Sequence, residues 1–160
     1  AGVLLADDRR TNGAMLDDES IEIKVNKAIN NKYADNVHVN VTSYNRYVLL
    51  TGEAPTQTQK DGIEQALKSV PNIRGIYNEI VHGNPSTLGA RSNDAYITSK
   101  VKARLLDQSK VQTNHVKVVT EGNIVYLLGL VKKSEAQAAT DVASTTGGVR
   151  KVVKLFEYTD

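Results

Sequence analysis

The sequence contains no cysteine among its 160 residues. Disulfide bonds, thiolate catalysis and cysteine-based metal sites are therefore excluded for these residues. Long apolar runs are also missing, because no stretch approaches the about 18 consecutive apolar residues that a membrane-spanning helix needs. A large charge of one sign is absent as well, since the formal net charge is only +2. Any basic binding surface must therefore be local.

Motifs that carry enzyme chemistry are missing too. The sequence has no Gly-x-Ser-x-Gly motif and no phosphate-binding glycine loop. His38, His82 and His115 do not have a spacing typical of metal ligands. Asp17 and Asp18 are interpreted as solvated or helix-capping carboxylates. We therefore expect no catalytic residues, no metal site and no cofactor.

Features of nucleic-acid binding modules are scarce. Small α/β modules that bind RNA use aromatic sheet faces or a Gly-x-x-Gly loop. This sequence has one phenylalanine and no such loop. Nucleic acid is therefore not an expected partner.

The first half of the sequence alternates between helical and strand-like patterns. Apolar residues recur at helical spacing from Asp18 onward, and two β-rich runs follow at 37–41 and 47–51. A second helix is expected to begin near Thr56, and residues 73–81 have the pattern of a third strand. The predicted order is helix, strand, strand, helix, strand.

The same order returns in the second half, with an offset of about 76 residues, as in an internal repeat. The matches fall at core-type and turn positions. The matched pairs are Ile21 and Ile97, Lys24 and Lys100, Val25 and Val101, His38 and His115, Val48 and Val125, Leu50 and Leu127, and Gly52 and Gly129. We infer that the chain contains two homologous domains.

The composition between and before the repeats sets the domain boundaries. Residues 83–92 are rich in Gly, Pro, Ser and Asn and have no period, as a linker does. Residues 1–17 are expected to form a flexible arm, with a surface-packed tail as the alternative. The first domain is then 18–82 and the second is 93–160. Each is predicted to be an α+β unit in which two helices cover a three-stranded sheet.

A spacing of Val-x-Leu-x-Gly, followed by a helix and then Gly-Val-x-x-Val-x-Asn, resembles the BON domain. The two copies carry Val48, Leu50, Gly52, Ile73, Ile76 and Asn78, and then Val125, Leu127, Gly129, Val149, Val152 and Lys154. Three residues depart from the family pattern: Ala54 at the valine two positions after Gly52, Asn72 at the glycine before Ile73, and Lys154 at the final asparagine. With its arm and linker, the chain resembles the dual-BON outer-membrane lipoproteins of Gram-negative bacteria, the division- and outer-membrane-stress-associated lipid-binding protein family.

The resemblance implies a non-enzymatic protein that binds anionic phospholipid, such as phosphatidylglycerol or cardiolipin, and supports outer-membrane integrity. It also implies an N-terminal lipid anchor at the periplasmic face of the outer membrane, with enrichment at the division site. The family's lipidated cysteine is not among these residues, so the anchoring inference requires a signal peptide and a cysteine upstream of Ala1. The alternative is a protein-interaction module that acts on envelope assembly or peptidoglycan-associated partners. We expect a monomer.

An amphipathic helix predicted at 93–107 differs from its counterpart in the first repeat. Its core-facing stripe, Ile97, Val101 and Leu105, is shared with the first repeat. Its outer face carries Tyr96 and Leu106, where the first repeat has Ser20 and Asn30. Both repeats should have the same fold, so the fold does not explain this difference, whereas a partner of the second domain does.

The outer face of this helix is therefore the predicted lipid-binding site. Apolar and basic groups on one face are typical of a helix that lies on an anionic membrane surface. Burial of Tyr96 and Leu106 against the first domain or the linker is the alternative interpretation. The predicted site residues are Tyr96, Ser99, Lys100, Lys102, Ala103, Arg104 and Leu106.

Overall fold

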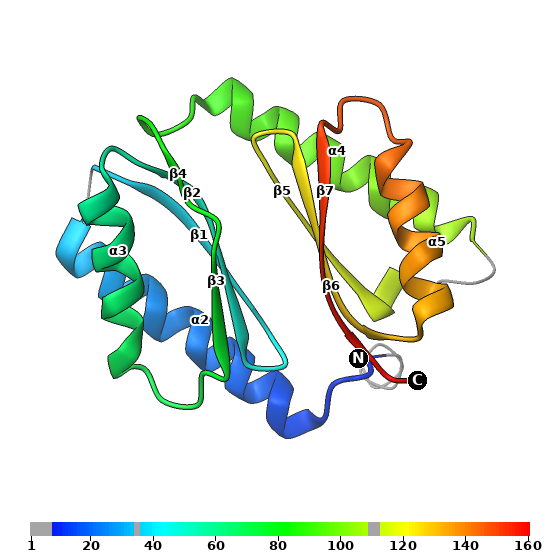
Figure 1. Cartoon of the computed structure of the whole chain (residues 1–160), viewed down its shortest axis with the longest axis horizontal. Helices are drawn as coiled ribbons and strands as arrows, with labels where there is room; N and C mark the ends of the chain where they lie inside the picture. Colours follow the sequence, from blue (N-terminus) through cyan, green and yellow to red (C-terminus); the bar gives the residue numbers. More distant parts are fainter. Residues whose placement is uncertain (1–7, 34–35, 109–112) are drawn as a thin grey trace. The chain divides into compact units, whose positions relative to one another are not determined.

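The computed structural model describes residues 8–33, 36–108 and 113–160. These residues fall into two compact units. The first unit comprises residues 11–87, and the second unit comprises residues 88–160 together with residues 8–10. Each unit has its own sheet and its own hydrophobic core (Figure 1).

The first unit contains two α-helices and a sheet centred on one strand. Its elements are α2 (Asn12–Tyr33), β1 (His38–Tyr44), β2 (Tyr47–Ala54), α3 (Gln57–Ala66), the 3-10 turn η1 (Leu67–Ser69), β3 (Gly75–Asn78) and β4 (Val81–His82). Strand β2 pairs antiparallel with β1 and parallel with β3 and β4. Helices α2 and α3 cover one face of the sheet (Figure 1). The predicted order of helix, strand, strand, helix and strand is confirmed. The predicted third strand at 73–81 is divided into β3 and β4, so this sheet has four strands and not the three that were predicted.

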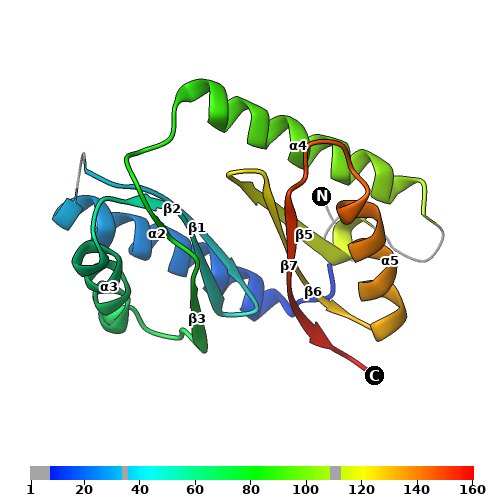
Figure 2. The same cartoon turned by 45° about the horizontal axis from the view of Figure 1, so that its top comes forward.

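The second unit repeats this arrangement. Its elements are α4 (Leu88–Leu106), the 3-10 turn η2 (Thr113–His115), β5 (Val116–Glu121), β6 (Ile124–Val131), α5 (Lys133–Ser144) and β7 (Lys151–Tyr158). The strand order is β5-β6-β7, with β6 antiparallel to β5 and parallel to β7. Helices α4 and α5 lie on the same side of this sheet (Figure 2). The predicted α+β fold with two helices on each sheet is confirmed.

Each core forms where the first helix of the unit packs on the central strand. The helix contributes residues at four-residue spacing, and the strand contributes alternate residues, so both inner faces are apolar. Fully burying such a side chain contributes about 1.5–3 kcal/mol. The contacting sets are Ile21, Val25 and Ile29 with Val48 and Leu50 in the first unit, and Ile97, Val101 and Leu105 with Val125 and Leu127 in the second unit.

A buried aspartate of α2 holds the β1–β2 turn in place. The Asp18 carboxylate accepts hydrogen bonds from Ser43 Oγ at 2.7 Å and from the N–H groups of Asn45 at 2.8 Å and Arg46 at 2.7 Å. Asn45 and Arg46 have positive φ angles of 49° and 67°, as in a tight hairpin turn. The interpretation of Asp18 as a solvated or capping group is wrong, because Asp18 is only 2% exposed.

The second unit uses Asp94 of α4 in the same way. Its carboxylate accepts the N–H groups of Gly122 at 2.9 Å and Asn123 at 3.0 Å. Both turn residues again have positive φ angles, 58° and 65°. A carboxylate on the first helix therefore satisfies the turn amides in both repeats, which a hydrophobic pattern cannot reveal.

Both long helices begin before their predicted positions. Helix α2 begins at Asn12, and Thr11 Oγ1 caps it by accepting the Ala14 N–H at 3.0 Å. Residues 12–17, predicted as part of the arm, are therefore helical. Helix α4 begins at Leu88, inside the predicted linker 83–92. Its first turns are exposed on all sides, so they carry no apolar period from which a helix can be predicted.

The arm packs on the second unit at residues 8–10. Arg9 forms a two-pronged ion pair with Glu135 at the start of α5, with Nη1–Oε1 and Nη2–Oε2 distances of 2.7 and 2.8 Å. The same Nη1 donates to the Leu130 carbonyl oxygen at 3.0 Å. These contacts hold this part of the arm on the surface of the second unit.

Acid should release the arm. Hydrogen bonds from Arg9 lower the pKa of Glu135 to about 2 from its ordinary value of 4.5. The ion pair thus stabilises the packed arm above about pH 4.5, and this contribution is lost as the pH falls toward 2.

A partly exposed ion pair of this kind contributes about 1 kcal/mol. This corresponds to about a fivefold change in the equilibrium between the packed and the released arm. Trypsin should therefore cleave at Arg9 and Arg10 about fivefold faster in Glu135→Gln than in the native chain at neutral pH.

Mass spectrometry of the cleaved arm measures the cleavage rates of the native chain and of Glu135→Gln. Asp141→Asn is the matched control, because it removes a carboxylate from the exposed side of the same helix. Equal cleavage rates for Glu135→Gln and Asp141→Asn would show that the ion pair does not hold the arm.

Candidate functional site

Helix α4 divides into a buried side and an exposed side. Ile97, Val101 and Leu105 fill the core of the second unit, and Asp94 is bound to the β5–β6 turn. These contacts fix the rotation of the helix about its own axis. The residues between them must then face away from the sheet.

The exposed side carries large apolar side chains along its length. Tyr96 is 62% exposed and Leu106 is 72% exposed. Leu88, which the predicted linker contained, is 80% exposed and lies at the start of the same helix. At 1.5 Å per residue, Leu88 and Leu106 are about 27 Å apart, or about five helical turns, so they fall on the same line along the helix.

Small polar and apolar residues fill the positions between these three side chains. We define the α4 outer strip by six exposed residues of this face: Leu88, Ser92, Tyr96, Ser99, Ala103 and Leu106. Ser99 Oγ donates to the Ala95 carbonyl oxygen of the preceding turn at 3.1 Å, so its hydroxyl is used within the helix. The outer strip therefore presents a smooth and largely apolar surface.

Lys100 and Arg104 lie on the side of the strip that faces the end of α5. Lys100 Nζ donates to the Gly147 carbonyl oxygen at 2.7 Å and lies 4.7 Å from the centre of the Tyr96 ring. Arg104 Nη1 donates to the Val142 carbonyl oxygen at 2.7 Å and to Thr146 Oγ1 at 2.8 Å. Arg104 thus compensates a carbonyl group at the negative end of α5, and Lys100 binds the loop that follows α5. Helical spacing alone does not predict these contacts.

Lys102 lies on the other side of the strip. It is exposed and has no ion-pair partner among the residues that the structure describes. The single acid of α4 is Asp94, which is buried, whereas its basic residues are Arg91, Lys100, Lys102 and Arg104. The surface of α4 is therefore basic along both borders of an apolar strip.

Helix α2 provides the comparison within the chain. Its outer face was predicted to be polar, but Leu16 is 68% exposed and Ile23 is 63% exposed. These two residues lie one above the other at seven-residue spacing and border a shallow hollow of about 250 Å³ together with Glu19, Ser20 and Lys24. Exposed apolar side chains therefore occur on both helices. The difference lies in charge, because α2 carries acids on its surface and α4 does not.

Within the described residues, no helix combines the length and the apolar character that crossing a bilayer demands.

The fold and the surface together define a class of protein: a tandem pair of small α+β modules, of which the second presents an apolar and basic helix. The model of the BON domain matches residues 17–84 and 93–160. The chain belongs to the BON-domain family, and the family predicted from the sequence is confirmed.

The chain is similar to several named proteins along most of their length. The chain is 37% identical over 158 residues to a protein named outer membrane lipoprotein DolP from Haemophilus influenzae, with 98% of this chain and 82% of that protein covered. It is 36% identical over 153 residues to a 21 kDa hemolysin of Actinobacillus pleuropneumoniae, covering 94% and 79%. It is 26% identical over 144 residues to osmotically-inducible protein Y of Escherichia coli, covering 88% and 72%.

Proposed function

We propose that the chain is a non-enzymatic protein of the bacterial envelope that binds anionic phospholipid through helix α4. The observation that carries this proposal is the α4 outer strip, which is apolar along its centre, basic on both borders and free of exposed acids. An amphipathic helix with these properties lies in the headgroup layer of an anionic membrane. The expected ligands are phosphatidylglycerol and cardiolipin.

The expected affinity is modest. A basic residue near an anionic surface contributes about 1 kcal/mol. Lys100 and Arg104 already form hydrogen bonds near the end of α5, so they attract the anionic membrane surface without contacting lipid headgroups. Lys102 is exposed and can contact the headgroups directly. Partial burial of the exposed apolar side chains adds about 3 kcal/mol. The three basic residues and the apolar side chains together then contribute about 6 kcal/mol. This binding free energy corresponds to a dissociation constant of tens of micromolar.

The proposed location is the periplasmic face of the outer membrane, reached through an N-terminal lipid anchor and enriched at the division site. The relative named outer membrane lipoprotein DolP supports an envelope location. Weak binding by α4 also fits this proposal, because stable residence on a membrane takes two signals, such as an acyl anchor and a basic surface.

A second candidate function is protein recognition by the first unit. The exposed pair Leu16 and Ile23 on α2 favours it, because apolar side chains around a hollow are typical of protein interaction sites. The partner would then be an envelope assembly protein or a peptidoglycan-associated protein. This function would be independent of α4, since it uses a different helix.

Titration of the ¹⁵N-labelled chain with vesicles tests the proposal. Phosphatidylglycerol vesicles should broaden the amide signals of the α4 outer strip first, and phosphatidylcholine vesicles should leave them unchanged. Raising the salt concentration from about 0.1 M to about 1 M should weaken binding, because the screening length falls from about 10 Å to about 3 Å. Equal broadening with both lipids, or broadening confined to α2, would overturn the assignment of α4 as the anionic lipid site.

A further inference from the structure

The large apolar side chains of the α4 outer strip stand far apart. Leu88 and Tyr96 are eight residues apart, and Tyr96 and Leu106 are ten residues apart. At a rise of 1.5 Å per residue, these separations are about 12 Å and about 15 Å along the helix axis. The other three positions of the strip carry two serines and one alanine, which are exposed but small. The strip therefore presents three separate apolar side chains and not a continuous apolar ridge.

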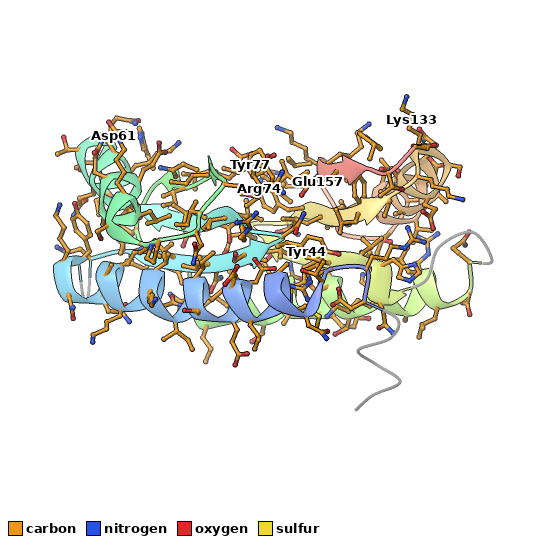
Figure 3. All side chains as sticks on the ribbon, turned by 90° about the horizontal axis from the view of Figure 1, so that it is seen from below. Tyr44, Asp61, Arg74, Tyr77, Lys133 and Glu157 are labelled. Carbon is orange, nitrogen blue, oxygen red and sulfur yellow. The ribbon has the colours of Figure 1, made fainter. Side chains whose placement is uncertain are left out.

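Helix α2 shows that the fold does not impose this spacing. The two helices align with an offset of about 76 residues, so Ser92 and Ser99 occupy the positions that Leu16 and Ile23 occupy in α2. Leu16 and Ile23 are largely exposed. Side chains on the outer face of α2 project away from the sheet of the first unit (Figure 3). The same positions thus accept large apolar side chains in one repeat and serine in the other. The gaps in the α4 outer strip are therefore a property of this surface.

The charges beside the strip favour an anionic surface of any packing. Lys102 is exposed on one border, and Lys100 and Arg104 lie on the other. One exposed acid, Asp107, directly follows the helix and offsets part of this charge. The attraction between these cations and an anionic membrane acts over about 10 Å at 0.1 M salt, so it does not depend on how closely the headgroups are packed.

Insertion of the apolar side chains does depend on headgroup packing. An apolar side chain enters the headgroup layer where neighbouring headgroups leave a gap between them. Three side chains that stand far apart need three separate gaps, and the small residues between them add little apolar area with which to open the layer. Such gaps are already present where headgroups are loosely packed. Sensitivity to lipid composition and curvature is a property of amphipathic helices of this kind.

We propose that the α4 outer strip selects anionic membranes whose headgroups are loosely packed. This inference rests on the proposed lipid-binding function and adds the class of membrane that α4 prefers. The preferred surface contains a lipid with a small headgroup, such as phosphatidylethanolamine, beside phosphatidylglycerol. The basic borders determine the response of binding to charge, and the three separate apolar side chains determine its response to packing.

Vesicles with a fixed fraction of phosphatidylglycerol test the proposal on the whole chain. The neutral lipid is phosphatidylcholine in one set and phosphatidylethanolamine in the other, so the charge is equal and the headgroup size differs. Co-sedimentation should show about fivefold tighter binding to the phosphatidylethanolamine set. Small sonicated vesicles of the phosphatidylcholine set should also be bound about fivefold more tightly than large vesicles, because strong curvature spreads the outer headgroups apart.

Ser92→Leu with Ser99→Ile is the decisive variant, because it places the residues of the first repeat in the gaps of the strip. It should bind the phosphatidylcholine set about twentyfold more tightly, and the ratio between the two sets should fall below about twofold. Asn30→Leu, at the position of α2 that matches Leu106, adds apolar area to the first unit and should change neither affinity. Lys102→Gln should lower both affinities about fivefold and leave their ratio unchanged.

The outcomes separate this inference from the proposed function. Equal affinity of the native chain for the two sets would overturn the inference and leave anionic lipid binding by α4 intact. A ratio that persists in the variant Ser92→Leu with Ser99→Ile would also overturn it, because the response to packing would then not depend on the gaps in the strip. An absence of binding to all phosphatidylglycerol vesicles would overturn the proposed function, and the inference with it.

Discussion

Replacing Leu88, Tyr96 and Leu106 together, as Leu88→Ser, Tyr96→Ala and Leu106→Ser, should lower the affinity for phosphatidylglycerol vesicles by somewhat more than about a hundredfold. Each side chain is expected to contribute about 1 kcal/mol through partial burial in the headgroup layer. All three are largely exposed in the protein, so their removal leaves the core of the second unit intact. Vesicle co-sedimentation at several lipid concentrations measures the change.

The matched control is the pair Leu16→Ser and Ile23→Ser on α2. It removes exposed apolar area of a similar kind from the first unit and should leave vesicle binding unchanged. Circular dichroism should show both variants folded. An equal loss of binding in the control, or undiminished binding in the α4 variant, would remove α4 from the proposed function.

Asp18→Ala should lower the free energy of unfolding of the first unit by about 3 kcal/mol. The change removes the acceptor of three hydrogen bonds, from Ser43 Oγ and from the N–H groups of Asn45 and Arg46. A buried donor left without an acceptor costs about 1–3 kcal/mol, and water at the turn should reduce this cost. For a unit of this size the melting temperature should fall by about 15 °C.

Hydrogen exchange resolved by residue is the measurement, because it reports each unit separately. Asp94→Ala removes two hydrogen bonds and should destabilise the second unit by about 2 kcal/mol. Glu19→Ala changes an exposed carboxylate beside Asp18 and should stay within about 0.5 kcal/mol of the native chain. If Asp18→Ala were as stable as Glu19→Ala, the turn would not depend on the buried carboxylate.

The fold could be predicted because its signals are local or repeated. Ile97, Val101 and Leu105 stand at helical spacing, and the same pattern occurs at Ile21 and Val25 in the first repeat. The role of Asp18 could not be predicted in this way. Its partners lie about 25 residues further along the chain, so their approach depends on how the helix packs on the hairpin.

The candidate site was predicted in part. The exposure of Tyr96 and Leu106 follows from their positions opposite the core stripe, and the structure agrees. Leu88 was missed because the first turns of α4 extend beyond the sheet and have no buried side. The contacts of Lys100 and Arg104 were missed because they depend on where α5 ends. Whether these residues bind lipid remains a prediction.

The ion pair between Arg9 and Glu135 determines which part of the protein a lipid anchor would restrain. With residues 8–10 held on the second unit, an anchor upstream would act on the unit that contains α4 rather than on the first unit. Short flexible tethers give effective concentrations of about 1 mM. A surface with an intrinsic dissociation constant of tens of micromolar would then be occupied for more than about 95% of the time. Weak membrane binding by α4 and the ion pair between Arg9 and Glu135 would together keep the second unit on the membrane.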